Sequence, residues 1–107
     1  MSASNQSSPT EQNGGVVVTI TLHARPDQAE TVLDLVTAAM RVSEDPAFLG
    51  GKVLTEIDDP TVVHMHQSWA DRVGFDAHMA GAGGFDQLGD LLVSAPTTTV
   101  LQHHLTR

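Results

Sequence analysis

Strict alternation of apolar and polar positions opens the informative part of the chain, from residue 16 to residue 24. Val16, Val18, Ile20 and Leu22 fall on one side of an extended backbone, and Val17, Thr19, Thr21 and His23 fall on the other. Because successive side chains of a strand point to opposite faces, this pattern predicts a strand with one apolar face.

The spacing of apolar residues then changes to that of a helix. Ala29, Val32, Leu33, Val36 and Met40 follow the i, i+3, i+4, i+7 rule after Pro26, which predicts an amphipathic helix ending near Ser43. Pro46 ends it, because the residue before a proline is pushed out of the helical conformation.

The second half of the chain predicts a hairpin, two short helical segments and a last strand. Strands are expected at 48–57 and 62–69, joined by the turn residues 58–61. Helical segments follow at 71–79 and 85–93, with a glycine-rich break at 81–84 between them. The β-branched residues of 97–105 predict the final strand.

This order, β-α-β-β-α-β, predicts an α+β fold of the ferredoxin-like kind, with four antiparallel strands and both helices on one face of the sheet. The other face has mixed polarity and no helix to cover it. We therefore expect a homodimer in which two sheets meet face to face.

Composition limits the classes of function. The 107 residues predict one domain at 16–107, preceded by a disordered polar tail at 1–15. Five basic against thirteen acidic residues give a charge of -8, which disfavours nucleic acid and anionic membrane partners. The chain has no cysteine for disulfides or thiolate chemistry, and no signal or membrane-spanning segment, so a cytoplasmic protein is expected.

The segment Val62–Met79 carries a resemblance to a known family. A strand that ends in Trp69 is followed by the charged start of a helix, an aromatic residue and the pair Ala77-His78. With the first strand and the entry to the first helix, this run resembles the antibiotic biosynthesis monooxygenase family over about residues 16–105. The resemblance implies a dimeric α+β barrel and, in some members, cofactor-free oxygenation of polyphenolic anthrones to quinones.

Two positions depart from the pattern of the quinone-forming members. Met65 stands where those members have an asparagine, and Phe75 stands where they have a tyrosine. Ile20 occupies the first-strand position where haem-degrading members have an asparagine, and the chain has no second tryptophan. Haem degradation is therefore not expected.

A ligand pocket is predicted between the apolar face of the sheet and the second helix. Alternation places Val63, Met65, Gln67 and Trp69 on the face that also holds Ile20. Besides Ile20, its expected lining residues are Met65, Trp69, Phe75, His78, Met79 and Phe85. Such a set suits a flat phenolic or polycyclic aromatic ligand, although the same residues could simply form a core.

Trp69 and His78 are the candidate catalytic residues. His78 follows Phe75 by three positions, so its imidazole could take a proton from a bound phenolic substrate at the flank of the buried helix face. Dioxygen would then be the co-substrate, with no cofactor or metal. The alternative for His78 is a structural role near the end of the helix.

His64 and His66 share the opposite face of the same strand. Two such histidines can chelate a metal, but the sequence places no carboxylate on that face of the neighbouring strand. A polar dimer interface is therefore favoured over a metal site. For the whole protein, the leading hypothesis is a quinone-forming monooxygenase, and the alternative is a non-oxygenase binding or isomerase-type protein of the same fold.

Overall fold

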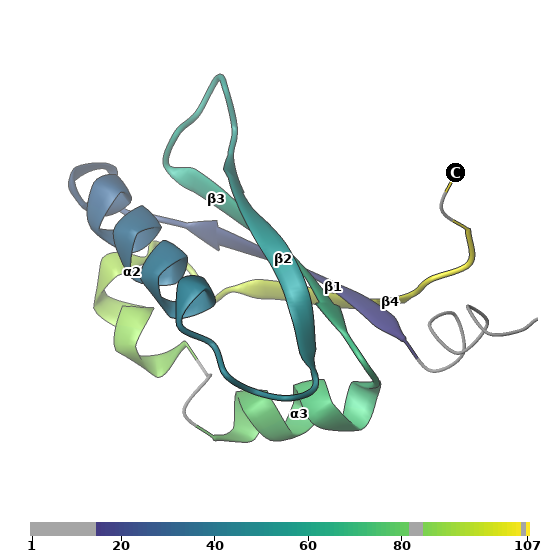
Figure 1. The fold of residues 1–107 in the computed structure, drawn as a ribbon. Coiled ribbons are helices and arrows are strands. Elements are labelled where there is room, and N and C mark those ends of the chain that lie inside the picture. The colour runs from purple at the N-terminus through teal and green to yellow at the C-terminus, as the bar shows by residue number, and fades with distance from the viewer. Residues whose placement is uncertain (1–14, 82–84, 106) are drawn as a thin grey trace, which may run out of the picture.

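A central strand, β1 (Val16–His23), organises the sheet in this computed structural model, which describes residues 15–81, 85–105 and 107. Strand β3 (Val62–Trp69) pairs antiparallel with one edge of β1, and β4 (Thr97–Gln102) pairs antiparallel with the other. Strand β2 (Phe48–Thr55) lies outside β3, which gives the order β2-β3-β1-β4 (Figure 1).

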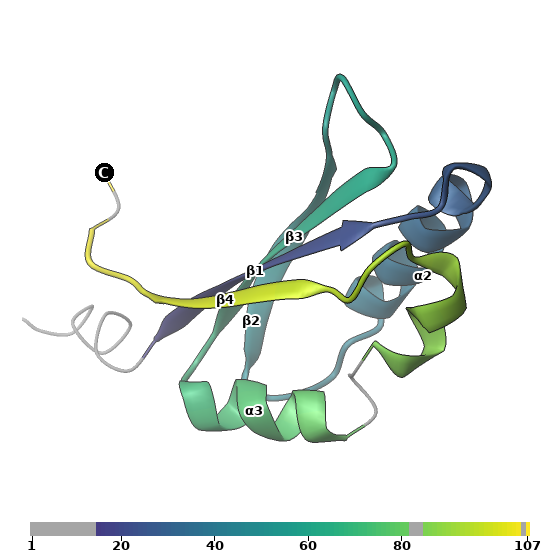
Figure 2. The same ribbon diagram turned by 180° about the vertical axis from the view of Figure 1, so that it is seen from behind.

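Helical segments connect the strands in the predicted order. A 3₁₀ turn, η2 (Pro26–Gln28), leads into α2 (Ala29–Arg41) between β1 and β2. Helix α3 (Arg72–Ala80) and the 3₁₀ segment η3 (Asp86–Leu91) lie between β3 and β4. The structure confirms the ferredoxin-like α+β fold expected from the sequence. The view from behind shows β4 beside β1 in the antiparallel direction, with β4 leading to the C-terminus (Figure 2).

The register of the sheet confirms the predicted assignment of faces. Ile20 lies opposite Met65, and Val18 lies opposite Gln67, so these side chains share the face that carries the helices. Thr21 lies opposite His64 on the other face. The period of two along each strand decides this division, because a slip of one residue would exchange the faces.

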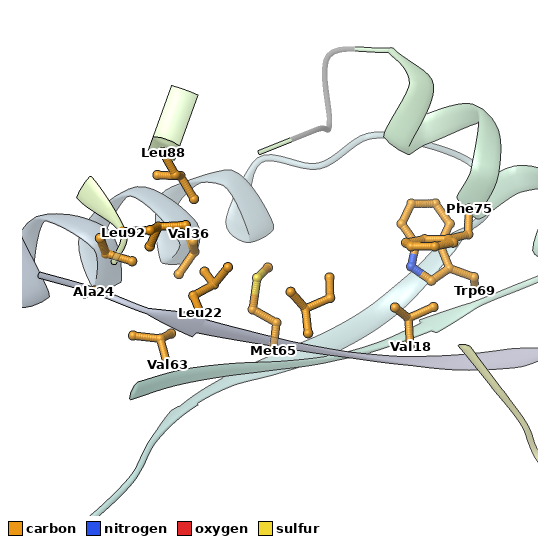
Figure 3. Close-up of a cluster of buried hydrophobic side chains, with 12 residues drawn as sticks. Val18, Leu22, Ala24, Val36, Val63, Met65, Trp69, Phe75, Leu88 and Leu92 are labelled. Carbon is orange, nitrogen blue, oxygen red and sulfur yellow. The ribbon is translucent and has the colours of Figure 1, made fainter. Parts of the chain in front are cut away.

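The core lies between this helix-bearing face and the helices. Val32 and Val36 are the buried residues of α2, and Leu88 is the buried residue of η3. Figure 3 shows the side chains of Val18 and Met65 rising from the strands toward the helices. Burial of this apolar surface is the main favourable term in folding.

Several elements are shorter than the sequence predicts. Strand β2 ends at Thr55 and β4 ends at Gln102, where the sequence predicted 57 and 105. The register of β2 shifts between Phe48 and Gly50, and Gly50 has a φ of 120°, a backbone conformation that favours glycine. The predicted tail falls almost wholly at 1–14, and the centre of the predicted glycine break falls at 82–84, both outside the described residues.

The β2–β3 hairpin closes with an ordered turn. The side chain of Asp59 accepts hydrogen bonds from the hydroxyl of Thr61 at 2.6 Å and from its backbone N–H at 3.2 Å. These two bonds lower the pKa of Asp59 below its ordinary value because they favour the charged carboxylate, and the bond from the hydroxyl has the larger effect. Local turn chemistry therefore fixes the loop that the sequence predicted at 58–61.

The opposite face of the sheet has no helix among the described residues. It carries threonines, histidines and two half-exposed leucines, Leu54 and Leu101.

No described helix is long and apolar enough to cross a membrane.

Ile20 offers a direct test of where the core lies. Its side chain is fully buried, so Ile20→Ala should lower the free energy of unfolding by about 2 to 5 kcal/mol, measured by urea denaturation. Val73→Ala, at a position that is 77% exposed on α3, serves as the control and should change it by less than about 0.5 kcal/mol. Equal effects at the two positions would contradict the assignment of Ile20 to the core.

Candidate functional site

Trp69, the last residue of β3, is the centre of an aromatic cluster. Its side chain is 1% exposed, and its ring centroid lies 5.3 Å from that of Phe48 and 5.6 Å from that of Phe75 in an edge-on arrangement. The imidazole of His78 lies 4.9 Å away at an interplanar angle of 48°. Tilted and edge-on contacts of this kind are favourable for aromatic rings.

Helix α3 is fixed against this cluster by its own first turn. Asp71 caps the helix by accepting a hydrogen bond from the backbone N–H of Gly74 at 2.7 Å. A Cβ at Gly74 would lie 2.4 Å from the Cβ of Ala47, so the start of α3 packs closely on the segment before β2. This anchoring directs Phe75 into the core beside Trp69 (Figure 3). His78 follows one turn later on the same helix and also contacts Trp69.

A cavity of about 590 Å³ opens beside Trp69. Residues of α2, β2, β3, α3 and η3 line it, together with the segment 42–45. Its apolar lining includes three methionines and three aromatic rings: Met40, Met65, Met79, Phe48, Trp69 and Phe85. Its volume is typical of sites for small molecules, and aromatic and methionine side chains adapt to flat surfaces.

The charged groups of the cavity are acidic. Glu44 and Asp45 belong to its lining, whereas no lysine or arginine is found among the described lining residues. A phosphate or carboxylate ligand would therefore meet no fixed positive charge there and would be repelled. A neutral ligand fits this cavity better.

His78 has a carboxylate beside it. Its Nδ1 lies 3.5 Å from Oδ2 of Asp45, and both side chains are a little over one-quarter exposed. The other oxygen of Asp45 accepts a hydrogen bond from the backbone N–H of Ala47 at 2.9 Å, which holds the carboxylate in place. A carboxylate beside Nδ1 favours the neutral tautomer with its proton on that nitrogen, and in this tautomer Nε2 has the free lone pair of a base.

Gln67 is the one polar side chain among the buried residues that the structure describes. It lines the cavity, and its Oε1 accepts a hydrogen bond from Nε1 of Trp69 at 2.9 Å. Gln67 and Trp69 are two positions apart on one strand and therefore share a face.

Five of the predicted pocket residues line this cavity: Met65, Trp69, His78, Met79 and Phe85. Two do not, and their assignment to the ligand pocket is corrected. Ile20, on one of the two inner strands, is fully buried in the core between the sheet and the helices. Phe75 is 4% exposed and packs edge-on against Trp69, so it supports the wall from behind.

Sequence reasoning missed Asp45 and Gln67 as members of the site. Asp45 belongs to the segment between α2 and β2, and only the fold brings it next to α3. Gln67 did carry a signal, since alternation placed a polar residue on an otherwise apolar face next to Trp69. A polar side chain in such a position needs a partner.

The histidines of the other face form a separate arrangement. Nε2 of His64 lies 2.8 Å from Oε2 of Glu56, and its Nδ1 lies 3.3 Å from the hydroxyl of Thr21. The sequence predicted no carboxylate on this face of the neighbouring strand. That prediction was wrong, because the hairpin folds Glu56, the residue after β2, onto this face beside His64. Within the described part of the chain, no three potential ligands converge as a metal site.

Comparison with protein families identifies the chain. The sequence model of the antibiotic biosynthesis monooxygenases matches residues 15–83, which is more than half of the sequence. The chain belongs to the antibiotic biosynthesis monooxygenase family. This family membership supports a general monooxygenase-like function. A search of curated proteins finds no match.

Solved structures share the fold at low sequence identity. A conserved protein from Methanosarcina mazei Go1 has a TM-score of 0.78 and 14% identity, with 88% of this chain and 97% of that chain covered. A Nitrosomonas europaea protein provisionally named an antibiotic biosynthesis monooxygenase has a TM-score of 0.77 and 18% identity, with coverage of 86% and 92%. Rv0793 from Mycobacterium tuberculosis has a TM-score of 0.73 and 20% identity, with 87% of this chain and 97% of that chain covered. At these identities the likeness shows the fold alone.

Proposed function

We propose that this member of the family is a cofactor-independent monooxygenase that converts a phenolic or polycyclic aromatic molecule to a quinone. The observation that carries the proposal is the position of His78 at the cavity, 4.9 Å from the ring of Trp69 and next to a fixed carboxylate. A proton acceptor beside an aromatic wall is what deprotonation of such a substrate requires.

The lining of the cavity supports the proposed substrate class. A flat ring system stacked against Trp69 would contact the sulfurs and methyl groups of Met65 and Met79 and bury most of its surface. The acidic groups of the cavity select against anions, and a neutral anthrone-type molecule satisfies both conditions.

The reaction balances without an external reductant. Nε2 of His78 removes a proton from a ring CH₂ group, and the resulting carbanion gives one electron to dioxygen. The substrate radical and superoxide combine to form a C–O bond, and the peroxide takes the proton back. Loss of water then leaves a carbonyl group, so the CH₂ carbon is oxidised and one oxygen atom is reduced to water.

The protein contributes orientation and exclusion of water in this scheme. Asp45 keeps the imidazole of His78 in one orientation, and the buried Trp69 forms a dry wall for the radical pair. A low-polarity surrounding also protects a reactive anion from protonation by solvent.

A binding protein without oxygenase activity is the second candidate. The observation in its favour is the absence of a polar group at Met65 and Phe75, where quinone-forming members carry an asparagine and a tyrosine. Such a protein would bind the same flat ligands and leave them unchanged.

We also propose that the chain functions as a homodimer joined through the sheet face that lacks helices. The half-exposed Leu54 and Leu101 and the threonines of β1 and β4 on this face would be covered by a second sheet. Two mixed faces of this kind would form a partly polar interface.

Oxygen uptake tests the enzymatic proposal. Metal-free protein mixed with anthrone should consume dioxygen and raise quinone absorbance above the buffer rate. His78→Gln should lower kcat by about 100- to 10,000-fold, the range that general-base catalysis contributes. His104→Gln, at an exposed position outside the cavity, is the matched control and should retain the rate.

A rate equal to that of buffer, with binding still visible in the fluorescence of Trp69, would favour the binding protein. A fully active His78→Gln variant would show that His78 is not the base of the reaction.

Light scattering tests the dimer. The expected mass is twice the 11.3 kDa of one chain. Leu101→Glu should shift the mass toward 11.3 kDa, because a carboxylate in an interface loses its hydration. Val73→Glu, on the exposed side of α3, should leave the mass unchanged. A mass near 11.3 kDa for the unaltered chain would contradict the proposal.

A further inference from the structure

The side-chain amide of Gln67 has a defined orientation. The indole Nε1–H of Trp69 can only donate a hydrogen bond, so the atom of Gln67 that receives it at 2.9 Å must be the oxygen. The two ends of a glutamine amide are otherwise hard to tell apart, and here the partner settles the choice. The amide nitrogen, Nε2, is therefore the end turned away from the indole nitrogen.

Nε2 of Gln67 carries two N–H donors, and neither has an acceptor among the described residues. No residue that the structure describes accepts a hydrogen bond from it, although the side chain is only 8% exposed. A buried donor without a partner lowers the stability of the fold, and an apolar side chain at this position would avoid that cost. Gln67 thus belongs to the wall of the cavity, and the described part of the chain leaves its donor capacity unused.

The unused groups are donors, which defines the ligand atom that they recognise. They would pair with an oxygen that accepts hydrogen bonds, such as a ring carbonyl. A carboxylate ligand would also accept, but Glu44 and Asp45 line the same cavity and repel it. A neutral ketone on a flat ring system meets both requirements.

We propose that Gln67 is the specificity-determining residue of this cavity, and that its Nε2 donates a hydrogen bond to the carbonyl oxygen of an aromatic ketone packed against Trp69. The inference rests on the proposed function only in taking the cavity as the ligand site, and it concerns binding. During deprotonation the same bond would stabilise the negative charge that develops on that oxygen. Gln67 would thereby supply an amide donor that Met65 lacks.

Two probes of nearly equal shape isolate this hydrogen bond. Anthrone has a carbonyl group where 9,10-dihydroanthracene has a CH₂ group. Titrations under argon prevent oxygenation, and Trp69, the single tryptophan of the chain, reports binding by its fluorescence. Anthrone should bind about tenfold more tightly than dihydroanthracene, because one neutral hydrogen bond contributes a difference in affinity of about this size.

Variants of Gln67 assign the preference to its amide. Gln67→Leu should remove the preference by weakening anthrone binding about tenfold, with dihydroanthracene affected little. Gln67→Glu keeps an oxygen for the indole N–H and removes both donors, so it should lose the preference while Trp69 stays bonded. Gln102→Leu, at an exposed glutamine of β4 outside this cavity, is the matched control and should keep the preference.

Equal affinities of the unaltered protein for the two probes would overturn the inference, as would a preference that survives Gln67→Glu. Failure of both probes to bind would overturn it as well, because the ligand class would be wrong. These outcomes are separate from failure of the proposed oxygenation, in which anthrone binds with the expected preference and no dioxygen is consumed in air.

Discussion

The site depends on the buried indole of Trp69. An indole N–H removed from water needs an acceptor, and the oxygen of Gln67 provides it at 2.9 Å. The same ring contacts Phe48 at the start of β2 and both Phe75 and His78 on α3. One side chain therefore joins three elements, orients the amide of its neighbour and forms the wall beside the candidate base.

The cavity exists because two helical segments cover different parts of one sheet face. Helix α2 buries Val32 and Val36 over the sheet, and α3 is anchored through Asp71 and Gly74 near the end of β3. Met65, Gln67 and Trp69 line the space left between them, at intervals of two along the strand. Members of the family can thus share this frame and differ in chemistry through a few residues on one strand.

Charge gives the two faces of the sheet different characters. On the helix-bearing face, the cavity holds Asp45 next to His78 and no described lysine or arginine, which suits a neutral ligand. On the other face, His64 lies between Glu56 and Thr21 in a partly exposed polar network. In a single chain both side chains of the His64–Glu56 contact are partly exposed, so this contact adds little to the stability of the isolated fold.

The sequence by itself determined the order of the elements, the first and last residues of strand β3, and the sheet face on which Trp69 and Met65 lie. These features follow from periods of two and 3.6, which are local properties of the backbone. Only the tertiary structure decided that Ile20 belongs to the core and that Asp45 meets His78. Such contacts join residues distant in the sequence, and packing determines which side chains remain beside a cavity and which are covered.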